Sequence, residues 1–487
     1  MPLRIRTRDF RGQASAEERF PVRIVVWKCA VPVHRTKNIS TAGSDPLRVG
    51  VPISRLSRQP LHALNSTTMK HTALLFPVLA ITALAENSTP PPPLTGEWSR
   101  QELTPQFWAE GACVADVNKD GKNDVLCGPF WYEGPDFAKR HVIYDMGSKG
   151  YDRKKEDGTT EKMPGFAGVP SGRNEYSNNF ISYAHDFNGD GWMDYLVIGF
   201  PGAETFWFEN PKGKDEPWNR FVALKPTDNE SPMFVDIDGD KQPDLLCMSK
   251  GGLGFATRNT KDPAAAWTWK NVTGAPQGRF QKFTHGIGHG DINGDGRTDI
   301  LEGEGWWEQP ANWDGTTPWT RHEVRFGMGA QMFGYDVNGD GKTDVITSLA
   351  AHAWGVAWFE QTNDGGAIGW TKHLIVGSKP GEGETAAIFS QPHAMDLADM
   401  NGDGTLDLIT GKRVWAHGPG GDPEPGAPPV LWWFELKRAG GKATWTAHLI
   451  DDKSGVGTQV MATDINGDKK PDVVVGNKRG AFVFLRK

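Results

Sequence analysis

The stretch Asp291-Ile-Asn-Gly-Asp-Gly-Arg-Thr-Asp299 decides the fold, because the chain repeats its pattern seven times. Each copy reads D-x-(N/D)-x-D-(G/K)-x-x-D, and oxygen-bearing side chains occupy positions 1, 3, 5 and 9. Oxygen ligands on alternate residues of a tight turn are what Ca²⁺ prefers in proteins. The sequence therefore predicts up to seven calcium loops.

Four positions in each copy supply the candidate metal ligands. They are Asp116, Asn118, Asp120, Asp124, Asp186, Asn188, Asp190, Asp194, Asp236, Asp238, Asp240, Asp244, Asp291, Asn293, Asp295, Asp299, Asp336, Asn338, Asp340, Asp344, Asp399, Asn401, Asp403, Asp407, Asp464, Asn466, Asp468 and Asp472. Two copies carry Lys241 and Lys469 where the others have glycine at position 6. A lysine there adds positive charge beside the ion, so we expect these two loops to be the weakest sites.

The residues around each loop predict strands. Short apolar runs such as Tyr195-Leu-Val-Ile198 and Val473-Val-Val475 follow the ninth position directly, and such β-branched runs bounded by glycine are typical of strands. An EF-hand would instead place Glu at position 12, between two helices. Each loop is therefore expected to join two antiparallel strands in a hairpin.

Two further phrases recur between the loops. One is an aromatic pair followed by Glu, as in Trp207-Phe-Glu209, and the other reads W-x-x-H, as in Trp370-Thr-Lys-His373. With the hairpin they make four strand-like pieces in each repeat, and the repeat length suits propeller blades. The last repeat lacks its W-x-x-H piece, and Trp98-Ser-Arg-Gln-Glu-Leu103 precedes the first repeat. We therefore expect an all-β fold, a seven-bladed β-propeller of four-stranded blades over residues 96–487. A strand at about 96–103 would complete the last blade and close the ring.

These phrases resemble the FG-GAP/VCBS repeat family across the whole of residues 96–487. The resemblance implies a seven-bladed β-propeller with Ca²⁺ in its D-x-(D/N)-x-D-G loops. The family includes adhesion modules, scaffolds and enzymes, so the resemblance leaves the activity open.

The front of the chain predicts export. Residues 69–85 combine a basic start, an apolar run and an A-x-A ending, which is the pattern of a secretory signal peptide. We interpret residues 1–68 as a disordered upstream extension of the reading frame, and the rival interpretation is a genuine basic pre-sequence. Residues 86–95 form a proline-rich linker. Cleavage near Ala85 would deliver a secreted or periplasmic protein.

Charge and motif content exclude several functions. Beyond residue 85 the chain holds 40 Lys and Arg against 56 Asp and Glu, a net charge of −16. There is no basic stripe for nucleic acid, and the one long apolar stretch is too short to insert in a membrane. No nucleophile elbow, P-loop or dinucleotide motif is present, which argues against the usual hydrolases, kinases and dehydrogenases.

Three cysteines remain beyond the signal peptide. Cys113 and Cys127 flank the first calcium loop at equal distance, so they are expected to face each other across the hairpin. A disulfide would suit an exported protein, and two buried thiols are the alternative. Cys247 occupies the place of Cys127 in another repeat, which favours burial.

Histidines and glutamates recur where the hairpin strands begin and where the next turn follows, on the face opposite the calcium loops. The candidate catalytic residues there are His185, His285, His289, His352, His393, Glu110, Glu230 and Glu304. A single histidine in a propeller channel is more often a polar filler. Several converging imidazoles and carboxylates instead suit Zn²⁺ or another divalent metal, or acid–base chemistry.

A long segment between the first two repeats, residues 144–180, is expected to be a loop on the same face. Its mixture of cation, aromatic ring and amides suits sugar hydroxyls, and Gln391 lies close to His393 in sequence. The candidate substrate-binding residues are Arg173, Tyr176, Asn178, Asn179 and Gln391. A surface insertion without function is the alternative.

The repeat phrases and histidine positions are also similar to the propeller domain of the fungal aldos-2-ulose dehydratase family. That resemblance implies a zinc-dependent elimination of water from keto-sugars such as 1,5-anhydrofructose. One hypothesis is therefore a secreted metal-dependent carbohydrate lyase. The other is a non-catalytic propeller that binds a glycan or a protein partner with the same face.

Overall fold

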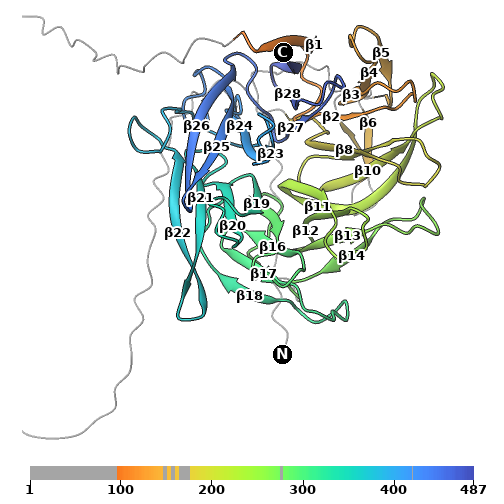
Figure 1. The fold of residues 1–487 in the computed structure, drawn as a ribbon. Coiled ribbons are helices and arrows are strands. Elements are labelled where there is room, and N and C mark those ends of the chain that lie inside the picture. The colour runs from red at the N-terminus through yellow and green to blue at the C-terminus, as the bar shows by residue number, and fades with distance from the viewer. Residues whose placement is uncertain (1–95, 146–150, 155–159, 164–175, 275–277, 419) are drawn as a thin grey trace, which may run out of the picture. The chain divides into compact units, whose positions relative to one another are not determined.

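The computed structural model describes residues 96–145, 151–154, 160–163, 176–274, 278–418 and 420–487. Every regular element within these ranges is a β-strand (Figure 1). No helix among them is long and apolar enough to cross a membrane. The expected pre-sequence, signal peptide and linker lie outside the described residues.

The first sheets are antiparallel meanders, in which consecutive strands pair. One contains β2 (Cys113–Ala115), β3 (Asp124–Cys127), β4 (Phe130–Tyr132) and β5 (Arg140–Val142). The next contains β8 (Ile181–His185), β9 (Asp194–Ile198), β10 (Ala203–Glu209), β11 (Asn219–Val235), β12 (Asp244–Ser249), β13 (Gly252–Thr257) and β14 (Thr268–Asn271). Because β11 pairs with β10 through its first part and with β12 through its second, it ends one meander and begins another.

The remaining sheets continue the same pattern. The strands of an eight-stranded sheet are β15 (Ile287–Gly290), β16 (Asp299–Glu302), β17 (Gly305–Glu308), β18 (Thr320–Glu323), β19 (Gln331–Tyr335), β20 (Asp344–Ser348), β21 (Val356–Asp364) and β22 (Ala367–Val376). Two meanders meet in it through the parallel pair β15 and β19. Another sheet holds β23 (Met395–Ala398), β24 (Asp407–Gly411), β25 (Leu431–Ala439) and β26 (Lys442–Asp451).

The last sheet joins the two ends of the described chain. It consists of β27 (Val460–Thr463), β28 (Asp472–Asn477), β29 (Gly480–Arg486) and β1 (Trp98–Thr104), and β1 pairs antiparallel with β29. The segment expected to be a single loop contains instead a two-stranded hairpin, β6 (Tyr151–Lys154) and β7 (Thr160–Met163).

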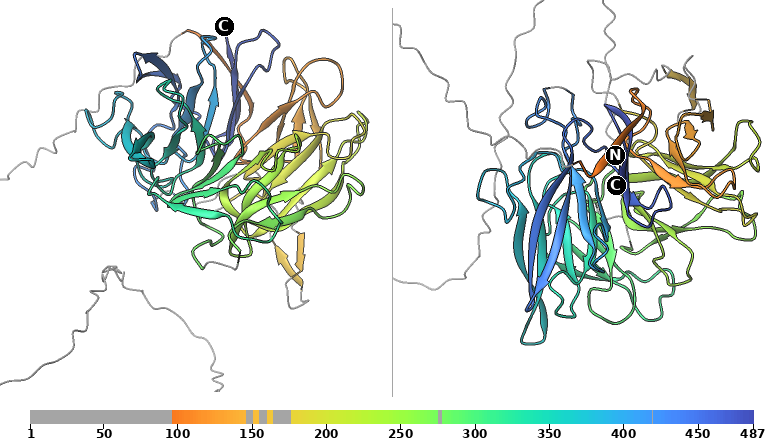
Figure 2. Two further views of the ribbon diagram at one scale, coloured as in Figure 1. Left: turned by 60° about the horizontal axis from the view of Figure 1, so that its bottom comes forward. Right: turned by 45° about the horizontal axis from the view of Figure 1, so that its top comes forward.

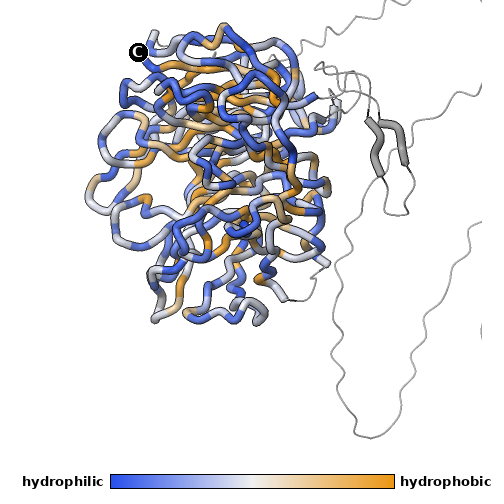
Figure 3. Tube along the Cα trace, turned by 90° about the vertical axis from the view of Figure 1, so that its right-hand side faces the viewer, coloured by the Kyte–Doolittle hydropathy of each residue, from blue (hydrophilic) through white to orange (hydrophobic). Residues whose placement is uncertain are grey.

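The meanders are arranged as in a β-propeller. Contacts run between the first strands of successive meanders, from β2 to β8, β11, β15, β19, β23 and β27. Figures 1 and 2 show the sheets following one another around a common centre. Apolar stretches alternate with hydrophilic ones along the chain (Figure 3), and the second strands β9, β20 and β24 are buried along their whole length.

The hairpin prediction is confirmed by the strand register. In each repeat the strands before and after the acidic loop pair antiparallel, and the residue before position 1 faces the aspartate at position 9, as in Gly290 opposite Asp299. Lys241 and Lys469 adopt φ angles of 68° and 70°, close to those of the glycines that replace them elsewhere. A left-handed conformation is costly for a residue with a side chain, so these two loops carry local strain.

The ninth aspartate of each loop also holds the backbone together. In the fourth loop Oδ2 of Asp299 accepts a hydrogen bond from the N–H of Ile292 at 2.9 Å, and Oδ1 accepts one from the N–H of Gln309 at 2.8 Å. The side chain of Gln309 then reaches the carbonyl of Ile237 in the preceding loop at 2.8 Å. Six of the seven ninth aspartates accept a hydrogen bond from a residue in or just after their own third strand. Side chains also link neighbouring loops.

The other recurring phrases pair with each other across adjacent strands. His373 of the W-x-x-H piece lies 2.9 Å from the carboxylate of Glu360, and its ring stacks on Trp358 with centroids 4.3 Å apart. The same His–Glu contact recurs at His322, His448 and His141. These histidines are used by the fold, as the repeat pattern predicts.

The disulfide alternative is not formed. Cys113, Cys127 and Cys247 are free and buried. The expectation that Cys113 faces Cys127 is wrong by one residue, because Cys113 pairs with Leu126. Adjacent residues of a strand point to opposite faces, which separates the two thiols.

We predict that Asp299→Ala destabilises the protein even without metal. Two backbone N–H groups, one buried and one half-buried, would lose their acceptor. Each loss costs about 1–3 kcal/mol, so the free energy of unfolding should fall by about 2–5 kcal/mol. Chemical denaturation in a calcium chelator measures the loss. Asp295→Ala, at the more exposed fifth position, is the control and should change this free energy by less than about 1 kcal/mol. Equal losses in the two variants would contradict the structural role.

Candidate functional site

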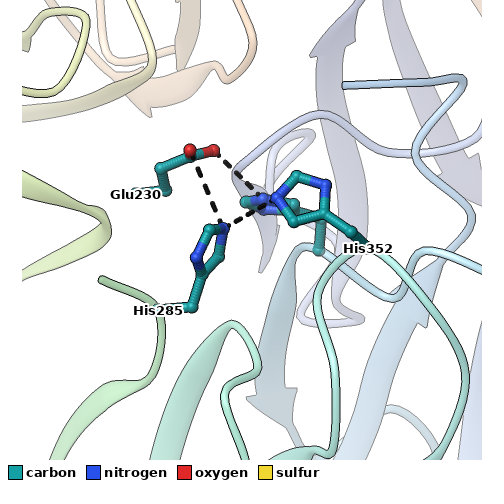
Figure 4. A group of neighbouring side chains, drawn as sticks. Glu230, His285 and His352 are labelled. Atoms are coloured by element: carbon teal, nitrogen blue, oxygen red, sulfur yellow. Dashed lines mark hydrogen bonds and ion pairs between the residues drawn. The ribbon is translucent and has the colours of Figure 1, made fainter. Parts of the chain in front are cut away.

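Four side chains from different parts of the chain converge at the centre of the fold. Glu230 lies in β11, His285 precedes β15, His352 follows β20 and His393 precedes β23. One ligating atom from each lies within 4.8 Å of the others. We call these four residues the His/Glu cluster. Figure 4 shows Glu230, His285 and His352 turned toward one another from separate elements.

The distances within the cluster are short. Nε2 of His352 lies 2.9 Å from Nε2 of His285, which in turn lies 3.7 Å from Oε1 of Glu230. Nε2 of His393 is 3.2 Å from Oε2 of Glu230 but is not aligned for a hydrogen bond. Buried nitrogen and oxygen atoms therefore face one another with few of their hydrogen bonds made.

A buried ion network lies directly beside the cluster. Arg413 has no exposed side-chain surface and spans two carboxylates: Nη1 is 3.3 Å from Glu230, and Nε and Nη2 are each 3.2 Å from Glu110. Lys478 adds a contact of 2.5 Å between Nζ and Glu110. Two cations thus balance two anions, and the three histidines add no charge when neutral.

Burial and this network set the protonation of the cluster. Burial, reinforced by His393, lowers the pKa of His285 to about 4. Burial also lowers the pKa of His352 and of His393. For Glu230, burial opposes ionisation, but the contacts with His393 and Arg413 outweigh it and hold the pKa well below its usual range. At neutral pH the cluster therefore holds three neutral imidazoles and one carboxylate.

The cluster opens to solvent on the side of His352. The exposed fraction of the side chains rises from 0% at His393 through 12% at His285 and 24% at His352 to 53% at His417. Nδ1 of His417 lies 2.7 Å from Oδ1 of Asp422, and its ring centroid lies 4.7 Å from that of His352. His417 and Asp422 therefore form the outer edge of the site.

The structure brings together half of the candidate catalytic residues and places Glu110 next to them through Arg413. His185 and His289 instead lie toward the acidic-loop ends of β8 and β15. Glu304 lies between β16 and β17, where it is 3.8 Å from Arg279. These three residues do not belong to the cluster.

The candidate substrate-binding residues do not lie together in one site. Arg173 lies outside the described residues, and Asn178 is exposed. The hydroxyl of Tyr176 donates to the carbonyl of Ala416, and the buried amide of Asn179 donates to the hydroxyl of Tyr195 at 2.8 Å.

Gln391 is buried and is used to position the site. Its N–H donates to the carbonyl of Ala353, beside His352, and its carbonyl accepts the N–H of Arg413. Its backbone takes a φ of 59°. This residue therefore ties the His352 turn to the ion network.

Arg413, Lys478, His417 and Asp422 were not predicted. A signal for the first two existed, because Arg413 and Lys478 each follow the ninth aspartate of their loop by six residues. That offset places them in the same turn of successive repeats, facing the centre. His417 and Asp422 lie in a long connection between β24 and β25 that has no counterpart in the repeat pattern.

We predict that Arg413→Gln is strongly destabilising, because it leaves two buried carboxylates without their shared cation. Breaking such a buried pair costs about 3–5 kcal/mol of unfolding free energy. Lys139→Gln is the control, since Lys139 forms an exposed pair with Glu133, and such pairs contribute about 0–1 kcal/mol. Denaturant unfolding measures both variants, and a loss at Arg413 as small as at Lys139 would disprove the role of the network.

Family models match three parts of the chain. The FG-GAP-like repeat matches residues 186–247 and 336–410, and the FG-GAP repeat matches residues 456–483. Comparison with curated protein sequences gave no match.

Solved structures with a similar trace include the β-propeller domain of Nup133 from Vanderwaltozyma polyspora, at 11% identity and a TM-score of 0.39, covering 81% of this chain and 98% of that one. Rhamnogalacturonan lyase YesW is 13% identical with a TM-score of 0.39, over 81% of this chain and 73% of that one. The Tc holotoxin pore of Photorhabdus luminescens is 16% identical with a TM-score of 0.35, and the match covers 74% of this chain but 18% of the toxin chain. At these identities and TM-scores the functions of those proteins are not transferred to this chain. For this chain the family models support FG-GAP repeats, on a fold arranged as a β-propeller.

Proposed function

We propose that this protein is a secreted, calcium-stabilised propeller that eliminates water from a keto-sugar or related carbohydrate with the help of a metal held by the His/Glu cluster. The observation that carries the proposal is the convergence of three imidazole nitrogens and one carboxylate at the centre of the fold. The resemblance to aldos-2-ulose dehydratases supplies the substrate class.

The donor set suits a zinc-like ion. A tetrahedral ion with ligands at about 2.1 Å needs neighbouring donors about 3.4 Å apart. The contacts of 2.9, 3.2 and 3.7 Å within the cluster bracket that value. Histidine with a single carboxylate is a common set for catalytic zinc and for other divalent transition metals.

The protonation of the cluster also favours metal. Metal ligands must be deprotonated before they bind a metal ion. A site whose imidazoles are neutral and whose glutamate is ionised at neutral pH therefore binds metal without the free-energy cost of removing protons. The unmade hydrogen bonds of His393 point the same way, because a buried nitrogen without a partner is costly unless something occupies it.

The residues at the edge of the cluster supply the remaining chemistry. The four cluster residues would hold the metal, which would take a substrate carbonyl as a fifth ligand, polarise it and make the neighbouring C–H more acidic. His417 would accept that proton and return it to the departing hydroxyl, which leaves as water, because Asp422 orients its Nδ1 and the ring stands on the exposed side beside His352. A base held by a carboxylate in this way is a common arrangement for proton transfer.

We predict that metal binding requires His393, whereas turnover requires both His393 and His417. After full-length wild-type protein is stripped of metal and reloaded with Zn²⁺, it should retain about one equivalent of Zn²⁺. The His393→Ala variant treated in the same way should retain none at this site. Turnover of 1,5-anhydrofructose and related keto-sugars, followed by the ultraviolet absorbance of an enone product, should disappear in the same variant. His417→Ala should keep the metal and lose activity about 10²- to 10⁴-fold. Wild-type protein that binds no transition metal would refute the proposal and favour a glycan- or protein-binding module.

Calcium is proposed to stabilise the opposite ends of the hairpins. The geometry of the third loop supports this, because the ligating oxygens at its positions 1, 3 and 5, on Asp236, Asp238 and Asp240, lie within 4.8 Å of one another. The ninth carboxylate has lone pairs beyond those that accept backbone N–H groups. We also propose that the meanders form seven blades, with the pairing of β1 and β29 closing the ring.

Calcium removal is predicted to lower the melting temperature by many degrees. A ligand at a hundredfold excess over its Kd adds about 2.7 kcal/mol per site to the folded state. Scanning calorimetry with calcium and with EGTA measures the shift, and a melting curve that does not move would exclude structural calcium. Asp295→Ala should reduce the calcium-dependent shift in melting temperature more than Asp468→Ala does, because the loop of Asp468 contains the strained Lys469 and is expected to bind calcium more weakly.

A further inference from the structure

We propose that Asp422 is a positioning residue for the cluster: it accepts a hydrogen bond from Nδ1 of His352 and so fixes Nε2 of that ring as a metal donor. This inference rests on the metal site proposed above and adds a residue outside the cluster. It assigns a role to a carboxylate that the repeat pattern does not include.

The first step concerns the two nitrogens of His352. Nε2 faces the cluster, 2.9 Å from Nε2 of His285. A neutral imidazole carries a single proton, so a ring that offers Nε2 to a metal must hold its proton on Nδ1. That N–H then needs an acceptor, and Nδ1 of His352 is buried with no hydrogen-bond partner.

The second step identifies the acceptor. Oδ1 of Asp422 lies 3.8 Å from Nδ1 of His352, so closure by about 1 Å would give an ordinary hydrogen bond. Asp422 is 2% exposed, and the contacts with the backbone and ring of His417 outweigh burial and keep its pKa below the usual value. It is therefore a buried carboxylate, ionised at neutral pH, aimed at the free nitrogen.

The third step explains why Asp422 is rigid enough for this role. Its Oδ2 accepts the N–H groups of Ala416 and His417 at 2.5 and 2.8 Å, and its Oδ1 accepts from the ring of His417. These three bonds fix the carboxylate before any metal binds. Histidine ligands oriented by such a carboxylate bind metal about 10- to 100-fold more tightly than those without it.

A second metal held by His352, His417 and Asp422 is the competing interpretation, because their ligating atoms also lie within 4.8 Å of one another. It would require Nδ1 of His352 to be a donor to metal while Nε2 serves the cluster. Asp422 already accepts three hydrogen bonds, which favours the positioning role.

The test is metal affinity in full-length protein, measured by competition with a chromophoric Zn²⁺ chelator. Asp422→Asn keeps an oxygen for the two backbone donors but turns an amide toward His352, so Zn²⁺ affinity should fall about 10- to 100-fold. The melting temperature of the metal-free variant should stay near that of wild type. The control His417→Ala leaves the carboxylate in place and should bind Zn²⁺ within about threefold of wild type.

A double-mutant cycle shows whether Asp422 acts through His352. In a His352→Ala background, Asp422→Asn should weaken Zn²⁺ binding no further, since the ring that it orients is gone. Independent losses in the cycle would overturn the proposal, as would unchanged affinity in Asp422→Asn. Absence of Zn²⁺ binding by wild type would instead refute the metal site itself.

Two direct measurements do not depend on the variant folding. In ¹⁵N-histidine-labelled, Zn²⁺-loaded protein, the ring of His352 should carry its proton on Nδ1. Stoichiometry should be about one Zn²⁺ per chain after calcium sites are saturated. A deprotonated Nδ1, or a second Zn²⁺ that His417→Ala removes, would establish the two-metal arrangement and overturn ours.

Discussion

The buried contact of Arg413 with Glu110 and Glu230 is the constraint on which the centre of this structure depends. The three residues come from separate parts of the chain, next to or within different sheets, and with Lys478 they form a neutral set of four charges. Buried charges are tolerated only when they are paired, so the sheets must meet in one arrangement to satisfy them. The network also fixes the carboxylate of Glu230 where three histidines converge, and the site is therefore a consequence of how the centre is assembled.

This arrangement explains why the histidines stay neutral. A cluster beside an unpaired glutamate would tend to bind protons, because an isolated anion favours imidazolium. Here Arg413 already neutralises Glu230, and burial disfavours further charge, so the pKa values of His285, His352 and His393 all fall. The same cation that stabilises the fold thus keeps the imidazole lone pairs available, and a divalent ion could use them.

Most of the cluster could be predicted from the sequence, because the acidic loops give a fixed reference position in every repeat. Glu110, Glu230, His285 and His393 each precede the first aspartate of their loop by six residues, and since strand periodicity carries equal offsets to equal places, all four meet at the centre. His185 and His289 sit closer to the loop, so a few residues of strand separate them from the cluster. Residues outside the repeat could not be placed in this way. Asp422 and His417 lie in an irregular connection whose path depends on tertiary contacts. The strand partner of Cys113 also depended on a one-residue register that composition does not determine.

The repeat also separates the acidic loops from the His/Glu cluster in space. Each hairpin has its acidic loop at one end and its central residue at the other, and a first strand of four or five residues at about 3.3 Å each places them roughly 15 Å apart. Oxygen-rich turns suit a hard cation, whereas imidazoles suit a softer one, so the two metals proposed above would bind at opposite ends of the hairpins. In six of the seven loops the ninth aspartate is hydrogen-bonded to its own third strand, and these bonds hold the hairpins at the end far from the cluster. A histidine of the cluster can therefore be replaced without breaking the contacts by which the acidic loops hold the hairpins.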